Sequence, residues 1–376
     1  MTNNFFIEVN RQKLKGFQTV QVTKTLESFV DIFAITVSTQ EKIINKLRVP
    51  QNLIKAGDEI RIFIDDNLIF TGFADQVSIA YNTDTHETNI NGRSRTSDLI
   101  DSSMIQKSYS QKDFKRLVEN VLTDNGYTDI SVLNNTTIDE IENSTLFKKQ
   151  TNTKTSSQTI FDFLDSYAQK VQVLLRTNEE GNIVLTREES GNTIGNLIST
   201  KNNPNNNIKS ATIIIDNINR FRFNQVQGQG DNSSYFTSTV NQTGEFEDTL
   251  IRSPRRKISS AKSASVSDEL GDLAKWETNL RRAKSLNYSC IVQGYYNDKK
   301  STSLWQPNTL VKILDDKCLL DGQFLIKGVT YNKAINGGST TTLNIVNRGT
   351  FNLDPDIIVT ELDSNDFASQ LSNNQS

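Results

Sequence analysis

Paired carboxylates are the residues of this chain whose types and spacing could carry out chemistry. The pairs considered are Asp65-Asp66, Glu188-Glu189 and Asp315-Asp316. Two carboxyl groups that flank one glycosidic bond can cleave it by acid–base catalysis. Adjacent residues of a strand, however, point to opposite faces, so none of these pairs converges on a single bond. We interpret them as turns and solvated strand edges.

The sequence offers no other complete catalytic or metal-binding set. His86 is the only histidine, so a Ser-His-Asp or Cys-His triad would have to use it. It falls in a polar segment, residues 82–87, which we predict to be a loop. The two cysteines, Cys290 and Cys318, form neither a disulfide framework nor a cluster with metal-ligand spacing. We therefore predict no catalytic residue, no cofactor and no metal, and a structural protein rather than an enzyme.

A basic run at residues 252–257 (Arg-Ser-Pro-Arg-Arg-Lys) could bind phosphate groups. It is short, has no interleaved aromatic residues and lies in a stretch that we predict to be flexible. We interpret it as a solvated loop or a contact with another protein. Trp276 and Trp305 could anchor a partner, because tryptophan is enriched at binding hot spots, but core packing explains them at least as well.

Composition limits the class of protein. The chain has 376 residues, 35% of them apolar and 23% charged, with a formal net charge of −3. This length suits two or three ordinary domains, and a pI near 5.5 provides no sequence-wide basic field for DNA or an anionic membrane. The first residues lack the pattern of a signal peptide, and no stretch approaches the ~20 apolar residues of a membrane span. We expect a protein assembled in a reducing compartment and not embedded in lipid.

The first hundred residues are predicted to be β-structure. Residues 19–23 and 33–37 alternate polar and apolar side chains, as half-buried strands do. Residues 58–72 contain two strands joined at an Asp-Asp-Asn turn, and residues 76–81 and 87–92 form a second hairpin. Short strands at this spacing indicate a small barrel or sandwich.

The next section is predicted to be α+β. Ser110 begins an acidic variant of the capping box ahead of a helix, and Gly126 stands where that helix should end. A second helix is predicted over residues 157–169, and residues 171–175 and 182–186 pair as a hairpin. The apolar side of the second helix consists of Ile160, Phe161, Leu164 and Ala168.

The rest of the chain alternates polar and structured segments. Asn202 to Asn207 is predicted to be a linker, since it contains a proline and has nothing to bury. We then expect a strand at residues 210–215, an extended excursion over residues 228–262 and a helix over residues 268–285. The apolar stripe of that helix comprises Leu273, Trp276, Leu280 and Ala283. The polar tail after residue 361 is predicted to be mobile.

An internal repeat relates the two ends of the chain. Residues 58–93 and 308–348 each contain a short alternating strand, an Asp-Asp hinge, a second strand that ends at glycine and a Thr/Asn-rich strand that ends at arginine. We interpret the two stretches as the same β-unit used twice, although a shared strand pattern without common origin is the alternative. Three copies of such a chain around a three-fold axis would form a ring of six similar units.

Three segments resemble the baseplate hub proteins of Mu-like contractile phages, and the resemblance covers most of the chain. Residues 160–164 lead into a hairpin at residues 171–187 as in that family, and residues 304–308 (Leu-Trp-Gln-Pro-Asn) follow a helix that contains Trp276 and Arg281. Residues 91–103 contain the pattern Gly-Arg-x-x-Thr-x-Asp-Leu-x-Asp. The signature residues are Gly92, Arg93, Thr96, Asp98, Leu99, Asp101, Trp276, Arg281 and Trp305.

We predict that the signature residues are structural, with Thr96, Asp98 and Asp101 making hydrogen bonds at a turn and a helix start. The resemblance implies an α+β, mainly β fold with two similar tube-like β-barrels, an α+β domain between them and a helical insertion in the second. The expected boundaries are 1–97 for the first barrel, 98–205 for the α+β domain, 206–228 with 286–353 for the second barrel, and 229–285 with 354–376 for the insertion and tail.

The resemblance also implies a function and partners. It implies a homotrimeric, pseudo-six-fold hub in the tail baseplate of a virion, assembled in the cytoplasm of the host bacterium. Such hubs bind a central spike protein on one side, a tail tube or tube-initiator protein on the other, and baseplate wedge proteins. Tape-measure protein and DNA pass through the lumen. The alternatives are the hub of a tailocin or a type VI-like secretion machine, a peptidoglycan-degrading tail enzyme and a receptor-binding fibre.

Overall fold

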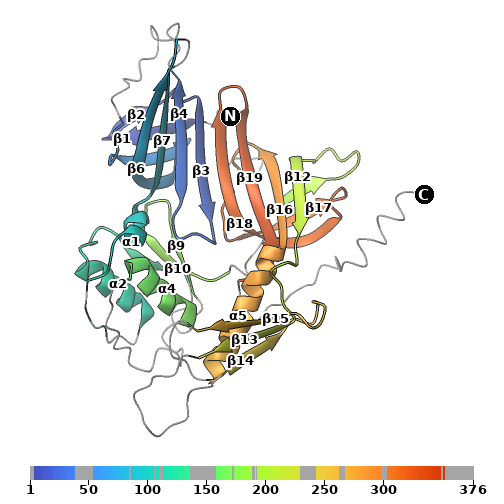
Figure 1. Ribbon diagram of the computed structural model, residues 1–376. Coiled ribbons are helices and arrows are strands. Elements are labelled where there is room, and N and C mark those ends of the chain that lie inside the picture. Colours follow the sequence, from blue (N-terminus) through green and yellow to red (C-terminus); the bar gives the residue numbers. More distant parts are fainter. Residues whose placement is uncertain are drawn as a thin grey trace. The chain divides into compact units, whose positions relative to one another are not determined.

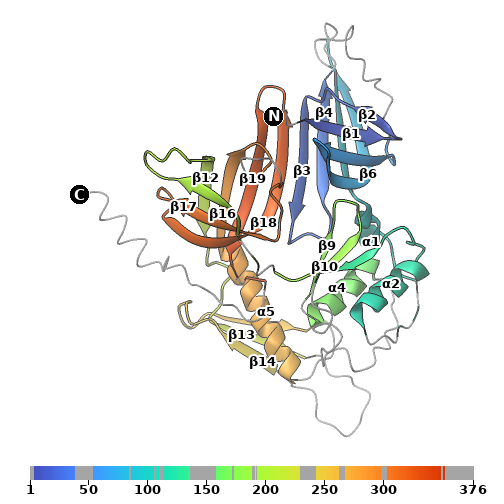
Figure 2. The same cartoon turned by 180° about the vertical axis from the view of Figure 1, so that it is seen from behind.

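The computed structural model describes residues 4–38, 54–83, 86–135, 158–228, 243–261, 267–297 and 303–351, apart from residues 106, 108, 110–112, 172, 189–190, 192 and 349. The chain divides into two compact units. The first contains residues 1–187 and 330–340, and the second contains residues 188–329 and 341–376. The fold is α+β and mainly β, as predicted (Figures 1 and 2). Ser110 and the tail after residue 361 lie outside the described residues.

The main sheet of the first unit has the strand order β3-β4-β7-β6-β5-β1-β2. Its strands alternate between a buried and an exposed face, which is why Ile60, Ile62 and Ile64 are fully buried while their neighbours are not. The strands are β1 (Phe5–Val9), β2 (Gln12–Leu14), β3 (Thr19–Thr25), β4 (Ile32–Ser38), β5 (Glu59–Ile64), β6 (Asn67–Tyr81) and β7 (His86–Ser94).

The two predicted hairpins share one strand. β5, β6 and β7 form an antiparallel meander in which β6 is continuous over 15 residues. The register between β6 and β7 shifts between Ala74 and Gln76, so Asp75 forms a bulge. This bulge interrupts the alternation of side chains, and the sequence pattern therefore suggested two separate strands. The predicted Asp-Asp-Asn turn is correct, and its Asp65 has a positive φ of 51°.

The α+β part of the first unit has its own core. The short helices η1 (Arg95–Ser97) and α1 (Asp98–Asp101) follow β7 directly. Helix α2 (Phe114–Asp124) begins after Asp113, whose carboxylate accepts from the Lys115 N–H. Gly126, with a φ of 89°, follows its C-cap residue Asn125, as predicted for the end of this helix. The remaining elements are α4 (Ile160–Lys170) and a small sheet of order β8-β10-β9, made of Val132–Asn134, Ile183–Thr186 and Leu174–Thr177. The predicted second helix and its hairpin are confirmed.

The second unit contains two sheets and one long helix. Its main sheet has the order β12-β16-β19-β18-β17-β11, and a smaller sheet has the order β14-β13-β15. Helix α5 (Ser267–Ser285) packs on the smaller sheet in both views (Figures 1 and 2). The strands are β11 (Thr193–Ser199), β12 (Ile208–Ile215), β13 (Phe223–Gln227), β14 (Thr243–Glu247), β15 (Arg256–Ser260), β16 (Leu286–Gln293), β17 (Thr309–Asp315), β18 (Leu320–Ala334) and β19 (Gly338–Asn347).

The two main sheets have corresponding strand orders. β3-β4-β7-β6-β5-β1 in the first unit matches β12-β16-β19-β18-β17-β11 in the second, strand for strand. The central strand of each, β6 or β18, is 15 residues long. One strand differs in direction, because β1 pairs antiparallel with β5 whereas β11 pairs parallel with β17. The similarity noticed in the sequence therefore extends from three strands to six.

Three sequence predictions in the second unit are wrong. The asparagine-rich run is a turn between β11 and β12, held by side-chain amides such as that of Asn207, which donates to the Asn196 carbonyl. The predicted excursion over residues 228–262 contains β14 and β15. The buried side of α5 includes the polar residues Thr278 and Asn279, whereas Leu280 is only half-buried.

Substituting Gly92 with Ala should destabilise the first unit strongly. A Cβ atom there would lie 2.0 Å from the Phe73 carbonyl oxygen and 2.5 Å from the Phe33 ring. We expect the free energy of unfolding to fall by roughly 2–4 kcal/mol. Gly271→Ala is the control, because nothing lies within 4 Å of its added Cβ and it is a helical residue. That change should stabilise by about 0.5–1 kcal/mol. Urea denaturation measures the free energy of unfolding of both variants. A Gly92→Ala variant as stable as wild type would contradict the close packing at Gly92.

Candidate functional site

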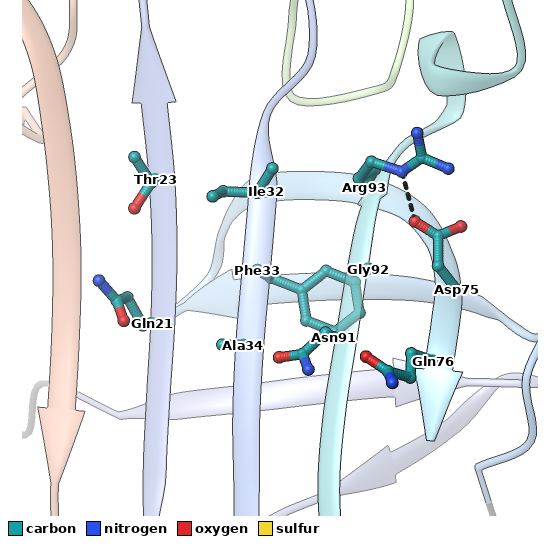
Figure 3. Close-up of a pocket in the computed structure, with 10 residues that line it drawn as sticks. All are labelled: Gln21, Thr23, Ile32, Phe33, Ala34, Asp75, Gln76, Asn91, Gly92 and Arg93. Atoms are coloured by element: carbon teal, nitrogen blue, oxygen red, sulfur yellow. Dashed lines mark hydrogen bonds and ion pairs between the residues drawn. The ribbon is translucent and has the colours of Figure 1, made fainter. Parts of the chain in front are cut away.

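A groove lies on the solvent side of the first unit's main sheet, on strands β3, β4, β7 and β6 (Figure 3). Its volume is about 430 Å³. Its lining consists mostly of uncharged side chains, with one arginine and one aspartate at one end. The lining residues are Gln21, Thr23, Ile32, Phe33, Ala34, Asp75, Gln76, Asn91, Gly92 and Arg93.

Strand register places the amide side chains in one row. Gln21 pairs with Ala34, Ala34 with Asn91, and Asn91 with Gln76, so the four residues cross the sheet side by side (Figure 3). Because the Ala34 side chain is short, the groove stays open between the longer amide side chains of Gln21 and Asn91. The row can donate and accept hydrogen bonds and carries no charge.

Arg93 closes one end of the groove. Its Nε donates to the Asp75 carboxylate at 2.6 Å, and its two terminal nitrogens donate to both oxygens of Asp101 at 3.2 and 2.7 Å. The bulge at Asp75 brings that carboxylate beside β7. A bidentate arginine–carboxylate pair is short and directional, so Arg93 joins β7, the β6 bulge and helix α1.

Charge around Arg93 is not balanced. The hydrogen bonds from Arg93 hold the pKa of Asp101 below its usual range. Burial raises the pKa of Asp98, and the nearby carboxylates of Asp101, Asp75 and Asp129 raise it further. Asp98 is exposed and accepts no hydrogen bond from Arg93 among the described contacts. The surface outside the groove is therefore acidic.

The first six signature residues come together here, but not as predicted. Neither η1 nor α1 has a side-chain cap, so Thr96, Asp98 and Asp101 do not cap a helix start. Thr96 is fully buried, and its hydroxyl lies 2.5 Å from that of Thr177, which donates to the Phe29 carbonyl. Leu99 is fully buried in the core of the α+β part. Thr177 is 81 residues from Thr96 in sequence, so local reasoning assigned Thr96 to a turn or cap.

The other three signature residues lie in the second unit. Trp276 and Trp305 are 8% and 2% exposed, so both pack inside the unit and are not free to anchor a partner. Arg281 donates to Asn224 at 3.0 Å and to Glu277 at 2.8 Å, which joins α5 to β13.

The interpretation of the carboxylate pairs was partly wrong. Asp315 is 1% exposed and accepts from the Tyr288 hydroxyl at 2.6 Å, and burial raises the pKa of the Tyr288 phenol. Glu188 is 7% exposed and accepts from the Phe351 N–H at 2.8 Å. Both are buried hydrogen-bonding groups and not solvated edges. Asp66 is exposed in its turn as expected, and Glu189 lies outside the described residues.

Two segments that were predicted to be loops contain residues of strands instead. His86 begins β7 and lies edge-on to the Tyr81 ring, with 6.3 Å between the ring centroids. Arg256 and Lys257 of the basic run belong to β15. The run itself has no aromatic residues, but Phe223 of β13 and Phe221 just before it lie next to its cations.

The described residues contain no group of three or more His, Cys, Asp or Glu side chains arranged to hold a metal ion. In the same part of the chain, no helix is long and apolar enough to cross a membrane. The groove itself contains no nucleophile with a neighbouring base, and its only carboxylate is bound to Arg93. Its geometry suits contact with another chain rather than bond cleavage.

Family comparisons agree with the repeated ends of the chain. Residues 5–94 match the family "Mu phage baseplate assembly protein GpP-like, N-terminal". Residues 267–354 match "Mu phage baseplate assembly protein GpP, fourth domain". Both ends of the chain are therefore similar to domains of Mu phage baseplate assembly proteins.

Similarity to these baseplate proteins extends over nearly the whole chain. The baseplate hub protein gp44 of Escherichia phage Mu is 23% identical over 363 residues, which is 93% of this chain and 89% of that protein. The 43 kDa tail protein of prophage MuSo2 from Shewanella oneidensis has a TM-score of 0.75 at 20% identity, covering 91% of this chain and 98% of that one. A type VI secretion system component of E. coli has a TM-score of 0.53 at 12% identity, covering 90% of this chain and 76% of that one.

A buried charge cluster in the first unit was not predicted from the sequence. Lys24 is 2% exposed and its ammonium lies 2.6 Å from Glu179 and 3.9 Å from Asp31. Burial raises the pKa of Asp31 to about 6, although Lys24 and Arg176 oppose the shift. The four residues come from β3, the β3–β4 loop, β9 and the β9–β10 turn. A charged residue inside a strand pattern, such as Lys24 among the apolar positions of β3, was the available signal.

Arg93→Gln should weaken the first unit modestly. The change removes three charge-assisted hydrogen bonds, but the side chains are partly exposed, so we expect a loss of about 1 kcal/mol in the free energy of unfolding at pH 7. The loss should shrink in acid, as Asp101 becomes protonated. Arg116→Gln is the matched control, because Arg116 is 76% exposed and 3.6 Å from Asp113. Equal urea midpoints for wild type and Arg93→Gln would refute the bridging role.

Asp31→Asn should stabilise the protein at neutral pH. The folded pKa of Asp31, about 6, lies above its ordinary value of 3.8, so ionised Asp31 lowers stability above pH 6. We expect a gain of roughly 1–3 kcal/mol at pH 7.5 that vanishes near pH 4, where wild-type Asp31 is protonated. Urea denaturation at both pH values tests this, with the exposed Asp66→Asn as control. A gain that persists at pH 4 would contradict it.

Proposed function

We propose that this chain is the hub of a contractile-tail baseplate and that it acts as a homotrimer. The observation that carries the proposal is the matching order of six strands in two sheets of one chain. Three copies around a three-fold axis would present six similar units, and such a ring can join a three-fold object to a six-fold one. In this proposal the two main sheets are parts of two tube-like barrels.

The proposed partners are those that the resemblance to baseplate hub proteins implies. A central spike protein binds the three-fold side, a tail tube or tube-initiator protein binds the six-fold side, and wedge proteins bind the periphery. Tape-measure protein and DNA pass through the hole. The uncharged amide row of the groove supports contact with polypeptide rather than with phosphate. The signature around Arg93 serves to hold helix α1 on the sheet, and the hub is a component of the virion assembled in the host cytoplasm.

Two other functions remain as alternatives. The same fold occurs in a type VI secretion component of E. coli, so a hub of a secretion machine or tailocin would use the chain in the same way. A peptidoglycan-degrading tail enzyme would need acidic groups that converge on one bond. Among the described residues the candidate carboxylates Glu188 and Asp315 are instead bound inside the second unit.

Light scattering of the purified protein at two concentrations tests the proposal. We expect a mass of three chains at both concentrations, and negative-stain images with six peripheral lobes around a hole. A monomer that stays monomeric when the spike protein is added would overturn the trimeric hub. Clearing of peptidoglycan in a zymogram by the pure protein would replace it with the enzymatic alternative.

A further inference from the structure

The second unit carries a basic surface that is stiffened by aromatic rings. The Arg255 guanidinium lies 5.3 Å and the Lys257 ammonium 6.0 Å from the centroid of the Phe221 ring. The guanidinium groups of Arg222 and Arg256 lie 6.0 and 5.4 Å from that of Phe223. Cations that stack on rings lose less freedom when they bind a partner. We call Arg222, Arg252, Arg255, Arg256 and Lys257, with these two rings, the basic patch. It wraps the edge of the sheet, because Arg256 and Lys257 are neighbours on the edge strand β15 and point to opposite faces.

Most charges of the basic patch have no counter-charge in the chain. Arg222 pairs with Glu247 at 2.7 Å, and Arg255 donates to the Ile218 carbonyl. Arg252, Arg256 and Lys257 are exposed, and within the part of the chain that the structure describes they make no ion pair. Such cations are available to a carboxylate from outside.

Apolar side chains adjoin the basic patch. Ile218, Leu250 and Ile258 are 70%, 44% and 50% exposed. Ile258 lies two residues beyond Arg256 on the same face of β15, and Ile218 carries the carbonyl that Arg255 binds. Exposed apolar residues next to unpaired charges are typical of protein interfaces. A phosphate backbone offers no apolar surface to cover these side chains, so the patch fits a protein partner better than a nucleic acid.

The first unit carries a surface of opposite sign. Five exposed carboxylates surround the two guanidinium groups of Arg93 and Arg95, which pair with four of them. The fifth, Asp98, accepts from neither; partial burial and then the nearby carboxylates raise its pKa, so an added cation would relieve the repulsion there. We call these residues the acidic patch: Glu59, Asp75, Asp98, Asp101 and Asp129.

We infer that the basic patch of one copy docks on the acidic patch of a second copy in the trimer. The inference rests on the proposed function, because it assigns the contact that closes the ring. A closed ring with one copy per step uses a heterologous interface, in which two different surfaces of each copy meet. The acidic patch lies on the first unit and the basic patch on the second, so each copy carries two surfaces of complementary charge.

Charge reversal of Arg252, Arg256 and Lys257 to Glu tests the contact. We expect the triple variant to associate about 100-fold more weakly than wild type, measured as trimer mass against concentration by light scattering. The control is the reversal of Arg11, Lys13 and Lys15, three exposed cations of the β1–β2 hairpin, which changes the net charge equally. Circular dichroism establishes that each variant folds. The wild-type protein offers a further test, because its association should weaken when NaCl rises from about 50 to 500 mM.

A second set of reversals tests the pairing itself. Adding Glu59→Lys and Asp98→Lys to the triple variant should recover at least about tenfold of the lost association. A trimer that is indifferent to the triple reversal, or equally weakened by the control, overturns the contact and leaves the hub intact. A trimeric triple variant that binds single-stranded DNA less than wild type does would assign the patch to nucleic acid instead. A monomeric wild type overturns the ring and the contact together.

Discussion

The close approach of β6 and β7 at two glycines is the constraint on which the first unit depends. A Cβ atom at Gly72 would lie 2.0 Å from the Arg93 carbonyl oxygen, and one at Gly92 would lie 2.0 Å from the Phe73 carbonyl oxygen. Strands this close cannot shift relative to each other, so the one-residue offset at Asp75 is accommodated as a bulge. The bulge carries the Asp75 carboxylate to Arg93, and Arg93 in turn holds Asp101 of helix α1. Leu99 then enters the core of the α+β part.

The junction between the sheet and the α+β part is polar. Lys24 and Asp31 are 2% and 3% exposed, which is rare for charged groups unless they are paired. Removal of Lys24 would leave two carboxylates, Asp31 and Glu179, without the ammonium that lies near both, whereas Asp31 is the member whose ionised form the site disfavours. The hydroxyls of Thr96 and Thr177 have the same role without charge, since each satisfies the other in a buried site. Hydrogen bonds thus set the geometry of this junction, and apolar packing lies on either side of it.

Sequence reasoning succeeded where local pattern decides structure. Alternation identified β3 and β5, Gly126 marked the end of α2, and the helical spacing of Ile160 and Leu164 located α4. It failed where a distant partner decides. Glu188 is buried because it accepts from Phe351, 163 residues away, and Thr96 because it meets Thr177, 81 residues away.

Partners distant in sequence also decide structure in the second unit. β13 and β15 pair in parallel although residues 228–255 separate them in the chain, and no short-range signal predicts such a pairing. The rings of Phe221 and Phe223 were therefore not associated with the cations of the basic patch, and the run was assigned to a flexible stretch. Thr278 and Asn279 likewise interrupted the apolar stripe of α5, although both are buried.

In the proposed ring, each subunit would have to attract its neighbours without holding the polypeptide and DNA that move through the channel. The groove meets the second requirement, because Arg93 neutralises its one carboxylate and the amides of Gln21, Asn91 and Gln76 carry no charge to retain a polyanion. The basic patch and the acidic patch would meet the first, because they lie on different units and differ in sign. Since like patches repel, contact between unlike patches favours a ring with a single direction over a symmetric dimer.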